Sequence, residues 1–197
     1  MKTGLIVLGV IILIVVGGIG WAIGINNQLV GQEQLVNEKW AQVQNVYQRR
    51  ADLVPNLVET VKGFAAQERT VLEEVTKARA SATAIQLSPQ ALSDPKAVER
   101  WQAAQNQLGG ALSRLLVTVE RYPDLKSNAN FLALQTQLEG TENRITVERR
   151  RFNEAVRDYN TRLRLFPGSV VASMAGYAPK AFFEATPDAA TAPKVKF

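Results

Sequence analysis

Residues 36–78 read VNEKWAQVQNVYQRRADLVPNLVETVKGFAAQERTVLEEVTKA, and apolar side chains recur along them at alternating intervals of four and three. That interval follows the turn of an α-helix and places a continuous apolar seam on one helix face. The 13 seam positions, of which 11 are apolar, are Val36, Trp40, Val43, Tyr47, Arg50, Val54, Leu57, Val61, Phe64, Glu68, Val71, Val75 and Ala78. The pattern predicts one long helix over about 28–80 that packs against other helices.

The composition around the seam excludes several classes of protein. The chain has 197 residues, with 23 Lys and Arg against 18 Asp and Glu, and it contains no Cys and no His. Disulfide frameworks, Cys/His zinc sites and Ser–His or Cys–His nucleophile pairs are therefore excluded. The length suits one domain with an appendage.

The segment before the seam is typical of a membrane anchor. Residues 4–25, GLIVLGVIILIVVGGIGWAIGI, contain no charged side chain. As a helix they would measure about 33 Å, close to the thickness of a bilayer's hydrocarbon core. The alternative is a cleaved signal peptide, whose apolar core is shorter, about 7–15 residues. We therefore expect residues 1–27 to be an uncleaved single-pass anchor.

The charges that flank this span favour one orientation. Lys2 and the terminal amine precede it, whereas Lys39 is the one basic residue of 26–45 and lies beside Glu33 and Glu38. Because basic flanks tend to stay in the cytoplasm, we expect an anchor in the bacterial inner membrane, with the bulk of the chain on the periplasmic or extracytoplasmic side.

Further helices are predicted downstream. Asp94 and Pro95 suit an N-cap and a first helical residue, for a helix that ends near 121. A third long helix is expected over about 128–166, and a short apolar one over 170–175.

The expected fold is therefore all-α. It consists of a single N-terminal transmembrane helix and an elongated antiparallel helical bundle of three long helices plus a short C-terminal helix. The bundle would occupy 28–185, with a membrane-proximal stalk of about 28–48, and residues 186–197 would form a flexible tail.

Pro55 lies inside the predicted first helix. Proline removes a backbone hydrogen bond and crowds the preceding turn, so a kink is expected near Ala51–Pro55. Asn56 could satisfy a carbonyl that the proline leaves free. The alternative is a full break into two helices at this point.

The helix lengths predict an uncovered stalk next to the membrane. The first helix would be about 80 Å long, the third about 58 Å and the second about 40 Å. If the three alternate in direction, about 20 Å of the first helix lacks an intramolecular partner. Its apolar residues Val36, Trp40, Val43 and Tyr47 are expected to join copies of the chain into a homo-oligomer. In the alternative, the kink folds this piece back and buries it.

Two charged residues, Arg50 and Glu68, interrupt the seam, and a charge that faces a core requires a partner. They lie about 27 Å apart along one helix, too far to pair with each other. The expected partners are Arg150 or Arg151 for Glu68, and Glu139 or Glu142 for Arg50. Such pairs would fix the register between helices, and the alternative is a polar recognition or switch site.

Arg150, Arg157 and Arg164 recur every seven residues and form a basic stripe on the third helix. Nearby acidic residues favour a solvated, salt-bridged face. Binding of anionic lipid or an acidic partner is the alternative, and nucleic acid is not expected because no aromatic platform accompanies the stripe. Without His and Cys the chain offers a metal only carboxylate ligands, which suit Mg²⁺ or Ca²⁺, and the His ligands of di-iron bundles are missing. No cofactor or metal is expected.

Three stretches resemble the LemA family of bacterial membrane proteins. They are RRADLVPNLVETVKGFAAQE at 49–68, YPDLKSNANFLALQTQLEGTENRI at 122–145 and FNEAVRDYNTRLRLFPGSVVA at 152–172. With the N-terminal span and the closing FFEA at 182–185, the resemblance covers nearly the whole chain. It implies an antiparallel bundle behind one membrane helix and no established enzymatic activity. It also implies roles in membrane organisation or association with membrane proteases.

The sequence thus favours a non-enzymatic, membrane-anchored, self-assembling helical scaffold that organises or shapes the membrane or its proteins. The first alternative is an adaptor that works with a membrane protease. The second is an enzyme with an unrecognised carboxylate site, which would require a deep pocket lined by acidic side chains.

Overall fold

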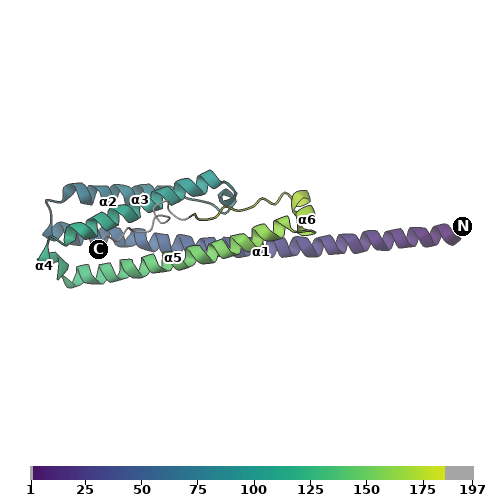
Figure 1. Ribbon diagram of the computed structural model, residues 1–197, viewed down its shortest axis with the longest axis horizontal. Helices are drawn as coiled ribbons and strands as arrows, with labels where there is room; N and C mark the ends of the chain where they lie inside the picture. The colour runs from purple at the N-terminus through teal and green to yellow at the C-terminus, as the bar shows by residue number, and fades with distance from the viewer. Residues whose placement is uncertain (1, 185–197) are drawn as a thin grey trace, which may run out of the picture.

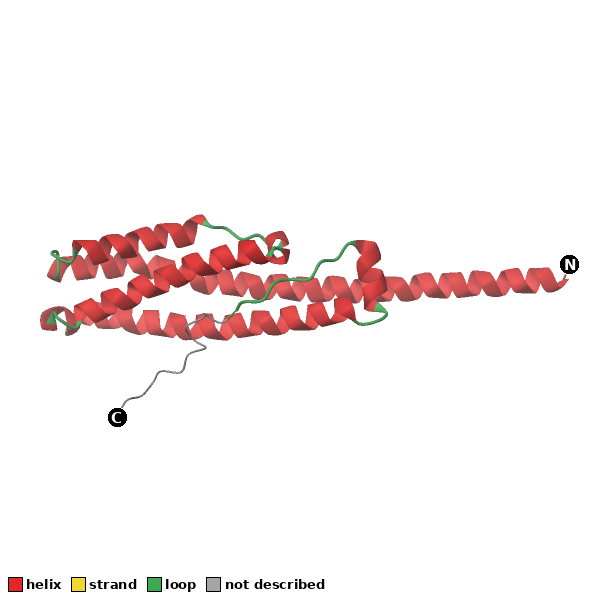
Figure 2. Ribbon diagram, turned by 45° about the horizontal axis from the view of Figure 1, so that its top comes forward, coloured by secondary structure: helices red, strands yellow, loops and turns green. Residues whose placement is uncertain are grey.

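The computed structural model describes residues 2–184, and over that range the chain is helical and contains no strand (Figure 2). The elements are α1 (Lys2–Phe64), α2 (Arg69–Ala84), η1 (Gln90–Ser93), α3 (Pro95–Val119), α4 (Pro123–Lys126), α5 (Ala129–Arg164) and α6 (Gly168–Ala175). The N-terminal part of α1 projects alone from one end of a rod built by α1, α2, α3 and α5 (Figure 1).

Helix α5 runs antiparallel to α1 along the length of the rod (Figure 1). Arg162 donates a hydrogen bond to Gln28. Further along, the rings of Trp40 and Phe152 lie 5.7 Å apart. Residue numbers fall along α5 as they rise along α1, which gives the direction. The long helices therefore alternate in direction, as in an up-and-down bundle.

The predicted first helix is in fact two helices. α1 ends at Phe64, and the chain turns back into α2 through Ala65–Glu68. The expected seam is lost there, because the side chain of Phe64 is 45% exposed whereas Val61 before it and Val75 after it are fully buried. The bundle consequently has four helices rather than three, and α2 and α3 close its distal half.

Pro55 is not where the chain divides. α1 continues through it to Phe64, so the alternative of a full break at Pro55 is wrong. Because proline has no N–H, the carbonyl of Ala51 loses its usual helical donor. The guanidinium of Arg79 in α2 replaces that donor, with Nε 2.8 Å from the Ala51 oxygen. Asn56 does not take this role: its side chain is exposed, and its backbone carbonyl accepts from Thr60.

The expected uncovered stalk is also wrong. Val36, Trp40, Val43 and Tyr47 are all 5% exposed or less within the single chain. Their core includes side chains from α3, α5, the connector before η1 and the C-terminal segment. The prediction failed because it placed the first and third helices parallel, whereas α5 descends beside α1 and covers it. Self-association through this seam has therefore lost its structural basis.

The Asp94 cap predicted from the sequence is confirmed, and two further helix ends have well-defined caps. The side chain of Asp94 accepts from the backbone N–H of Lys96 at the start of α3. Asn128 accepts from Asn130 and Phe131 at the start of α5. Gly176, with φ of 76°, ends α6 in the left-handed conformation that favours glycine. The predicted tail at 186–197 lies outside the described residues.

One helix of the described residues, α1, is long and apolar enough to cross a membrane. Its most apolar window of 18 residues has a mean hydropathy of 2.8, and none of that window is buried against the rest of the chain. A core helix of a soluble protein would instead be mostly covered.

Candidate functional site

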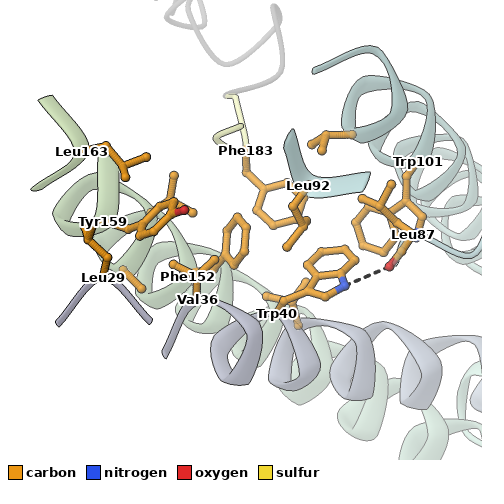
Figure 3. Close-up of a cluster of buried hydrophobic side chains, with 14 of the residues drawn as sticks. Leu29, Val36, Trp40, Leu87, Leu92, Trp101, Phe152, Tyr159, Leu163 and Phe183 are labelled. Carbon is orange, nitrogen blue, oxygen red and sulfur yellow. Dashed lines mark hydrogen bonds between the residues drawn. The ribbon is translucent and has the colours of Figure 1, made fainter. Parts of the chain in front are cut away.

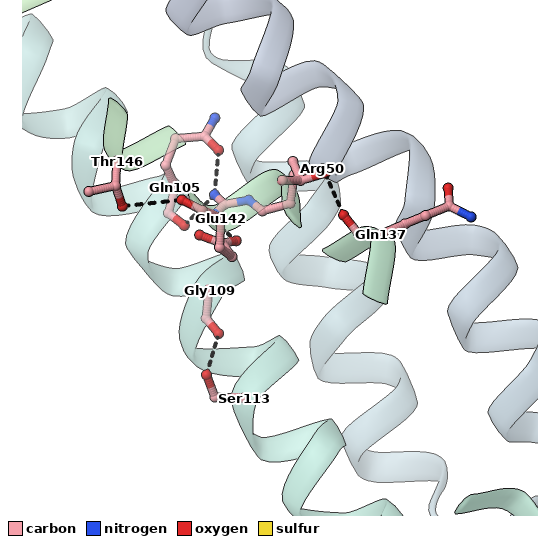
Figure 4. A network of polar contacts seen from close by, with 8 residues as sticks. Arg50, Gln105, Gly109, Ser113, Gln137, Glu142 and Thr146 are labelled. Carbon is pink, nitrogen blue, oxygen red and sulfur yellow. Dashed lines mark hydrogen bonds and ion pairs between the residues drawn. The ribbon is translucent and has the colours of Figure 1, made fainter. Parts of the chain in front are cut away.

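A buried arginine lies at the centre of the bundle. Arg50 is 4% exposed, and its Nη1 lies 3.0 Å from Oε1 of Glu142 in α5 (Figure 4). Its Nη2 donates to both the backbone and the side-chain oxygen of Gln105 in α3, each at 2.9 Å. The Gln105 amide in turn donates to the carbonyl of Ala82 at the end of α2. One guanidinium thus connects all four long helices.

The environment of Arg50 is asymmetric. Its partner Glu142 is 45% exposed on its side chain, so the cation is buried while the anion remains half-solvated. The Tyr47 ring lies under the guanidinium at 4.9 Å. Burial raises the pKa of the Tyr47 hydroxyl, although Arg149 and Arg50 act in the opposite direction. Of the two partners expected from the sequence, the structure places Glu142 and not Glu139 at the arginine.

The expected pairing of Glu68 with Arg150 or Arg151 is wrong. Oε1 of Glu68 accepts from the Tyr122 hydroxyl at 2.6 Å and from Arg121 at 3.1 Å, which holds the α1–α2 turn against the end of α3. That hydrogen bond to a carboxylate raises the pKa of Tyr122. The error follows from the parallel alignment assumed for the third helix.

The basic stripe faces solvent, and acidic side chains lie beside two of its arginines. Arg150 lies 3.8 Å from Glu154, and Arg157 lies 3.1 Å from Asp158. Arg164, at the end of α5, is also exposed. The three arginines therefore form a surface feature and take no part in the core.

An aromatic cluster fills the half of the core nearest the N-terminal apolar span, where α1, α3 and α5 meet (Figure 3). Trp40 lies 5.1 Å from Trp101 and 5.9 Å from Phe183, measured between ring centroids. Its indole N–H donates to the carbonyl of Leu87 at 3.0 Å. Phe183 comes from the segment after α6, so the end of the described chain completes the core.

Residues 177–184, which we call the strap, run back along the bundle from α6. Asn153 of α5 donates its amide to the Phe183 carbonyl and accepts from the Phe183 N–H, at 3.0 and 2.9 Å. Asn160, two turns further along α5, makes the same pair of bonds with Lys180, at 2.8 and 2.9 Å. The two side-chain amides thus pair with the strap as a neighbouring strand would.

A buried ion pair adds to the strap. Lys180 is 8% exposed, and its Nζ lies 2.9 Å from Oε1 of Glu33 in α1. The sequence analysis identified neither Asn153 nor Asn160 as partners of the strap, nor Lys180 within it. The signal that could have indicated these pairs is the interval of seven residues between the two asparagines of α5 and of three residues between Lys180 and Phe183 of the strap.

These polar groups bind one another, which limits their chemistry. Within residues 2–184, no three acidic side chains gather in a group that could hold a metal ion. The described part of the chain does contain an open groove between α1 and α2 at the distal end, with a volume of about 730 Å³. Val58, Leu72 and Ala80 line it, and Lys62 and Glu73 are among its charged residues. The arrangement therefore suits a structural role, in which the polar contacts fix the shape of the bundle and its surface contacts other molecules.

Comparisons with known proteins agree with this description. The sequence model of the LemA family matches residues 39–197. Magnetosome protein MamQ of Magnetospirillum gryphiswaldense is 27% identical over 177 residues, which cover 82% of this chain and 65% of the relative. MamQ 2 of Paramagnetospirillum magneticum is 25% identical with the same coverage. Protein LemA of Metamycoplasma hominis is 21% identical over 164 residues, 83% of this chain and 71% of the relative. The chain thus spans just under two thirds of the length of these MamQ proteins.

Proposed function

The chain belongs to the LemA family, and from that premise we propose that it is a membrane-anchored helical scaffold that organises the bilayer or the proteins within it. We propose a single-pass anchor in the bacterial inner membrane, with the bundle on the extracytoplasmic side. The partners of the scaffold would be lipid, further copies of the chain and other membrane proteins.

The observation that carries this proposal is the continuity of α1. One helix runs from the apolar span to the distal end of the bundle, from Lys2 to Phe64. No loop separates the span from the rod, and α5 and α6 pack against α1 where it enters the bundle. A force or a tilt applied to the rod would therefore pass directly to the span. This rigid coupling suits a scaffold better than a flexibly tethered enzyme.

Self-association remains part of the proposal, but it requires a surface other than the buried seam. The exposed span offers one, because Gly17, Gly20 and Gly24 face open space: within the described residues, nothing beyond their own helix backbone would contact a Cβ at these positions. Small residues let two membrane helices approach closely. We therefore propose that copies meet through the span.

Single-molecule photobleaching of the labelled full chain in lipid vesicles tests this proposal. We expect several copies in each assembly at low protein density. Replacing Gly20 and Gly24 by Leu should reduce the number of copies by blocking close approach. The matched control is Gly31→Leu, which changes an equally open glycine of α1 outside the span. Single copies of the unaltered chain at all densities would contradict self-assembly.

A second candidate function is an adaptor for a membrane protease, and the distal α1–α2 groove favours it. The groove has apolar walls and charged rims, a combination that suits an amphipathic partner helix. Ala80→Arg in the groove should then abolish co-purification of a stoichiometric protease, whereas Ala103→Arg on the exposed face of α3 should preserve it. Equal recovery with both variants would argue against the groove.

A further inference from the structure

We infer that residues 165–175, which comprise the turn before α6 and α6 itself, form a second membrane contact, immersed in the leaflet that holds the upper end of the α1 span. We call these residues the membrane foot. The inference rests on the membrane anchor and is independent of whether copies of the chain assemble.

The height of α6 along α1 is the first argument. α6 and α1 enclose an apolar depression of about 350 Å³, lined from α1 by Ile19, Ala22 and Ile23 and from α6 by Val171 and Met174. The three α1 residues belong to the uncharged stretch 4–25. If that stretch crosses the bilayer, α6 lies at the depth of its last two turns (Figure 1).

The length of free helix below α6 leads to the same conclusion. Residues 4–18 are the part of the stretch beneath the contact, and as a helix they measure about 22 Å. A bilayer's hydrocarbon core is about 30 Å thick. If the hydrocarbon core covered residues 4–18 alone, it would be thicker than that length of helix. If it also surrounds the foot, its thickness matches the length of the whole stretch 4–25.

The surface of the foot is the second argument. Leu165, Phe166, Val170 and Met174 are all more than half exposed, and Phe166 and Met174 reach 78% and 85%. The Phe166 ring also lies 6.4 Å from that of Trp21, and Trp is enriched at membrane interfaces. Such a group of large apolar side chains within one short segment is unfavourable in water and favourable in the outer hydrocarbon of a leaflet.

Polar groups mark the upper limit of immersion. Directly above the foot, Tyr177 donates to Asn26 at 3.1 Å, and Arg162 donates to Gln28. Arg162 and the exposed Arg164 end α5 at this level, and no acidic residue lies between Asp158 and Glu184. The rim is thus cationic and complements anionic headgroups. Apolar side chains below a basic rim are the arrangement of an interfacial helix.

The foot occupies one leaflet only. It would add cross-sectional area to that leaflet beside the span, and it would fix the height and rotation of the rod relative to the bilayer.

Single-cysteine variants of the full chain test the inference, because the chain contains no Cys. Phe166→Cys and Met174→Cys report on the foot. Leu13→Cys, 73% exposed, reports on the span, and Val117→Cys, 71% exposed in α3, is the matched control on the bundle. Each is labelled with a polarity-sensitive fluorophore in vesicles of phosphatidylcholine and phosphatidylglycerol. Quenching is then measured with aqueous iodide and with nitroxide-labelled lipid.

We expect the labels at 166, 174 and 13 to be quenched by nitroxide lipid and to be several-fold less sensitive to iodide than the label at 117. Iodide quenching at 166 and 174 equal to that at 117, with position 13 still lipid-quenched, would overturn the foot and leave the anchor in place. Iodide quenching at all four positions would overturn the anchor and the proposed function with it. Circular dichroism of each labelled variant establishes that the bundle is folded.

Discussion

Arg50 shows how much of the bundle depends on one side chain. Its guanidinium reaches α3 and α5 directly and α2 through Gln105, and only its Nε lacks a hydrogen-bond partner. Removing the cation leaves the buried side-chain oxygen of Gln105 without a donor, and its helical carbonyl loses a second donor, whereas Glu142 can turn to water. The cost of a substitution at Arg50 therefore comes mainly from the α3 side.

Replacing Arg50 by Met should lower the free energy of unfolding by about 2 kcal/mol, because buried acceptors lose their charged donor. Chemical denaturation followed by circular dichroism measures the change. The neighbouring Arg49 is exposed, so Arg49→Met is the control, with an expected change within about 0.5 kcal/mol. Equal effects of the two substitutions would show that the buried contacts contribute nothing.

A double-mutant cycle tests the substitution of a side-chain donor for a backbone donor at Pro55. Arg79→Met should cost about 1 kcal/mol, since the Ala51 carbonyl then has no donor. In a Pro55→Ala background, residue 55 regains its N–H and the same substitution should cost less. Identical costs in both backgrounds would mean that Arg79 does not compensate for the proline. Lys77→Met, at an exposed position of α2, is the control.

Tyr159 predicts alkaline destabilisation. Burial, followed by the nearby Glu33 and Tyr177, raises the pKa of its hydroxyl. The folded state therefore holds this proton more tightly than the unfolded state. The resulting stability is fully present below about pH 10 and is lost as the pH rises further. Urea unfolding midpoints should fall with pH above about 10, and less steeply in Tyr159→Phe. Equal slopes would contradict the assignment.

At the scale of elements, the strap shows how a helix can hold an extended segment. Asn153 and Asn160 are separated by two helical turns, about 10.5 Å, and Lys180 and Phe183 by three extended residues, about 10 Å. The two spacings match, so each asparagine faces one backbone unit of the strap and satisfies both its N–H and its C=O. This match explains why a segment without regular secondary structure is held in the core.

Replacing both asparagines by Ala should release the strap without melting the helices. We expect faster hydrogen exchange over 180–183 and a red shift in tryptophan emission, because Phe183 no longer covers Trp40 and Trp101. Far-ultraviolet circular dichroism should change little. Asn143→Ala, at an exposed position of the same helix, is the control. Unchanged exchange in the double variant would show that the aromatic contacts alone hold the strap.

At the scale of the whole molecule, the rod and the span share one helix, and the membrane-proximal part of that helix is core. Leu29, Val36 and Trp40 are buried by α5 and the strap. The part of α1 between the span and the distal end, which includes Leu29, Val36 and Trp40, is therefore as much a part of the folding unit as the distal part. The segment that the sequence led us to expect as an uncovered stalk is part of the packed core.

Two truncations test this conclusion. A chain that begins at Gly24 keeps every core residue of α1 and should be helical with cooperative thermal unfolding. A chain that begins at Arg49 lacks Val36, Trp40, Val43 and Tyr47, and it should lose cooperative unfolding because each missing side chain removes about 1.5–3 kcal/mol of burial. Differential scanning calorimetry distinguishes the two. A cooperative transition in the shorter chain would contradict the single folding unit.

The sequence by itself determined the local features of this protein. The uncharged length of residues 4–25 indicated a candidate membrane span, the intervals of three and four indicated helices, and Asp94 and Pro95 indicated where one of them begins. Each of these features depends on neighbours within a few residues, which is why the pattern contains them. The polar residue Arg50 was likewise identified as needing partners on other helices.

Only the tertiary structure decided which surfaces meet. The seam looks alike before and after Ala65–Glu68, and no proline or glycine within those four residues marks the turn, so the choice between one helix and two depends on whether α2 can cover α1 and α3. The same holds for Arg79 at the Ala51 carbonyl, for the asparagines at the strap and for the height of α6. Contacts between residues far apart in the chain depend on competition among similar apolar faces, and a local pattern does not encode the outcome of that competition.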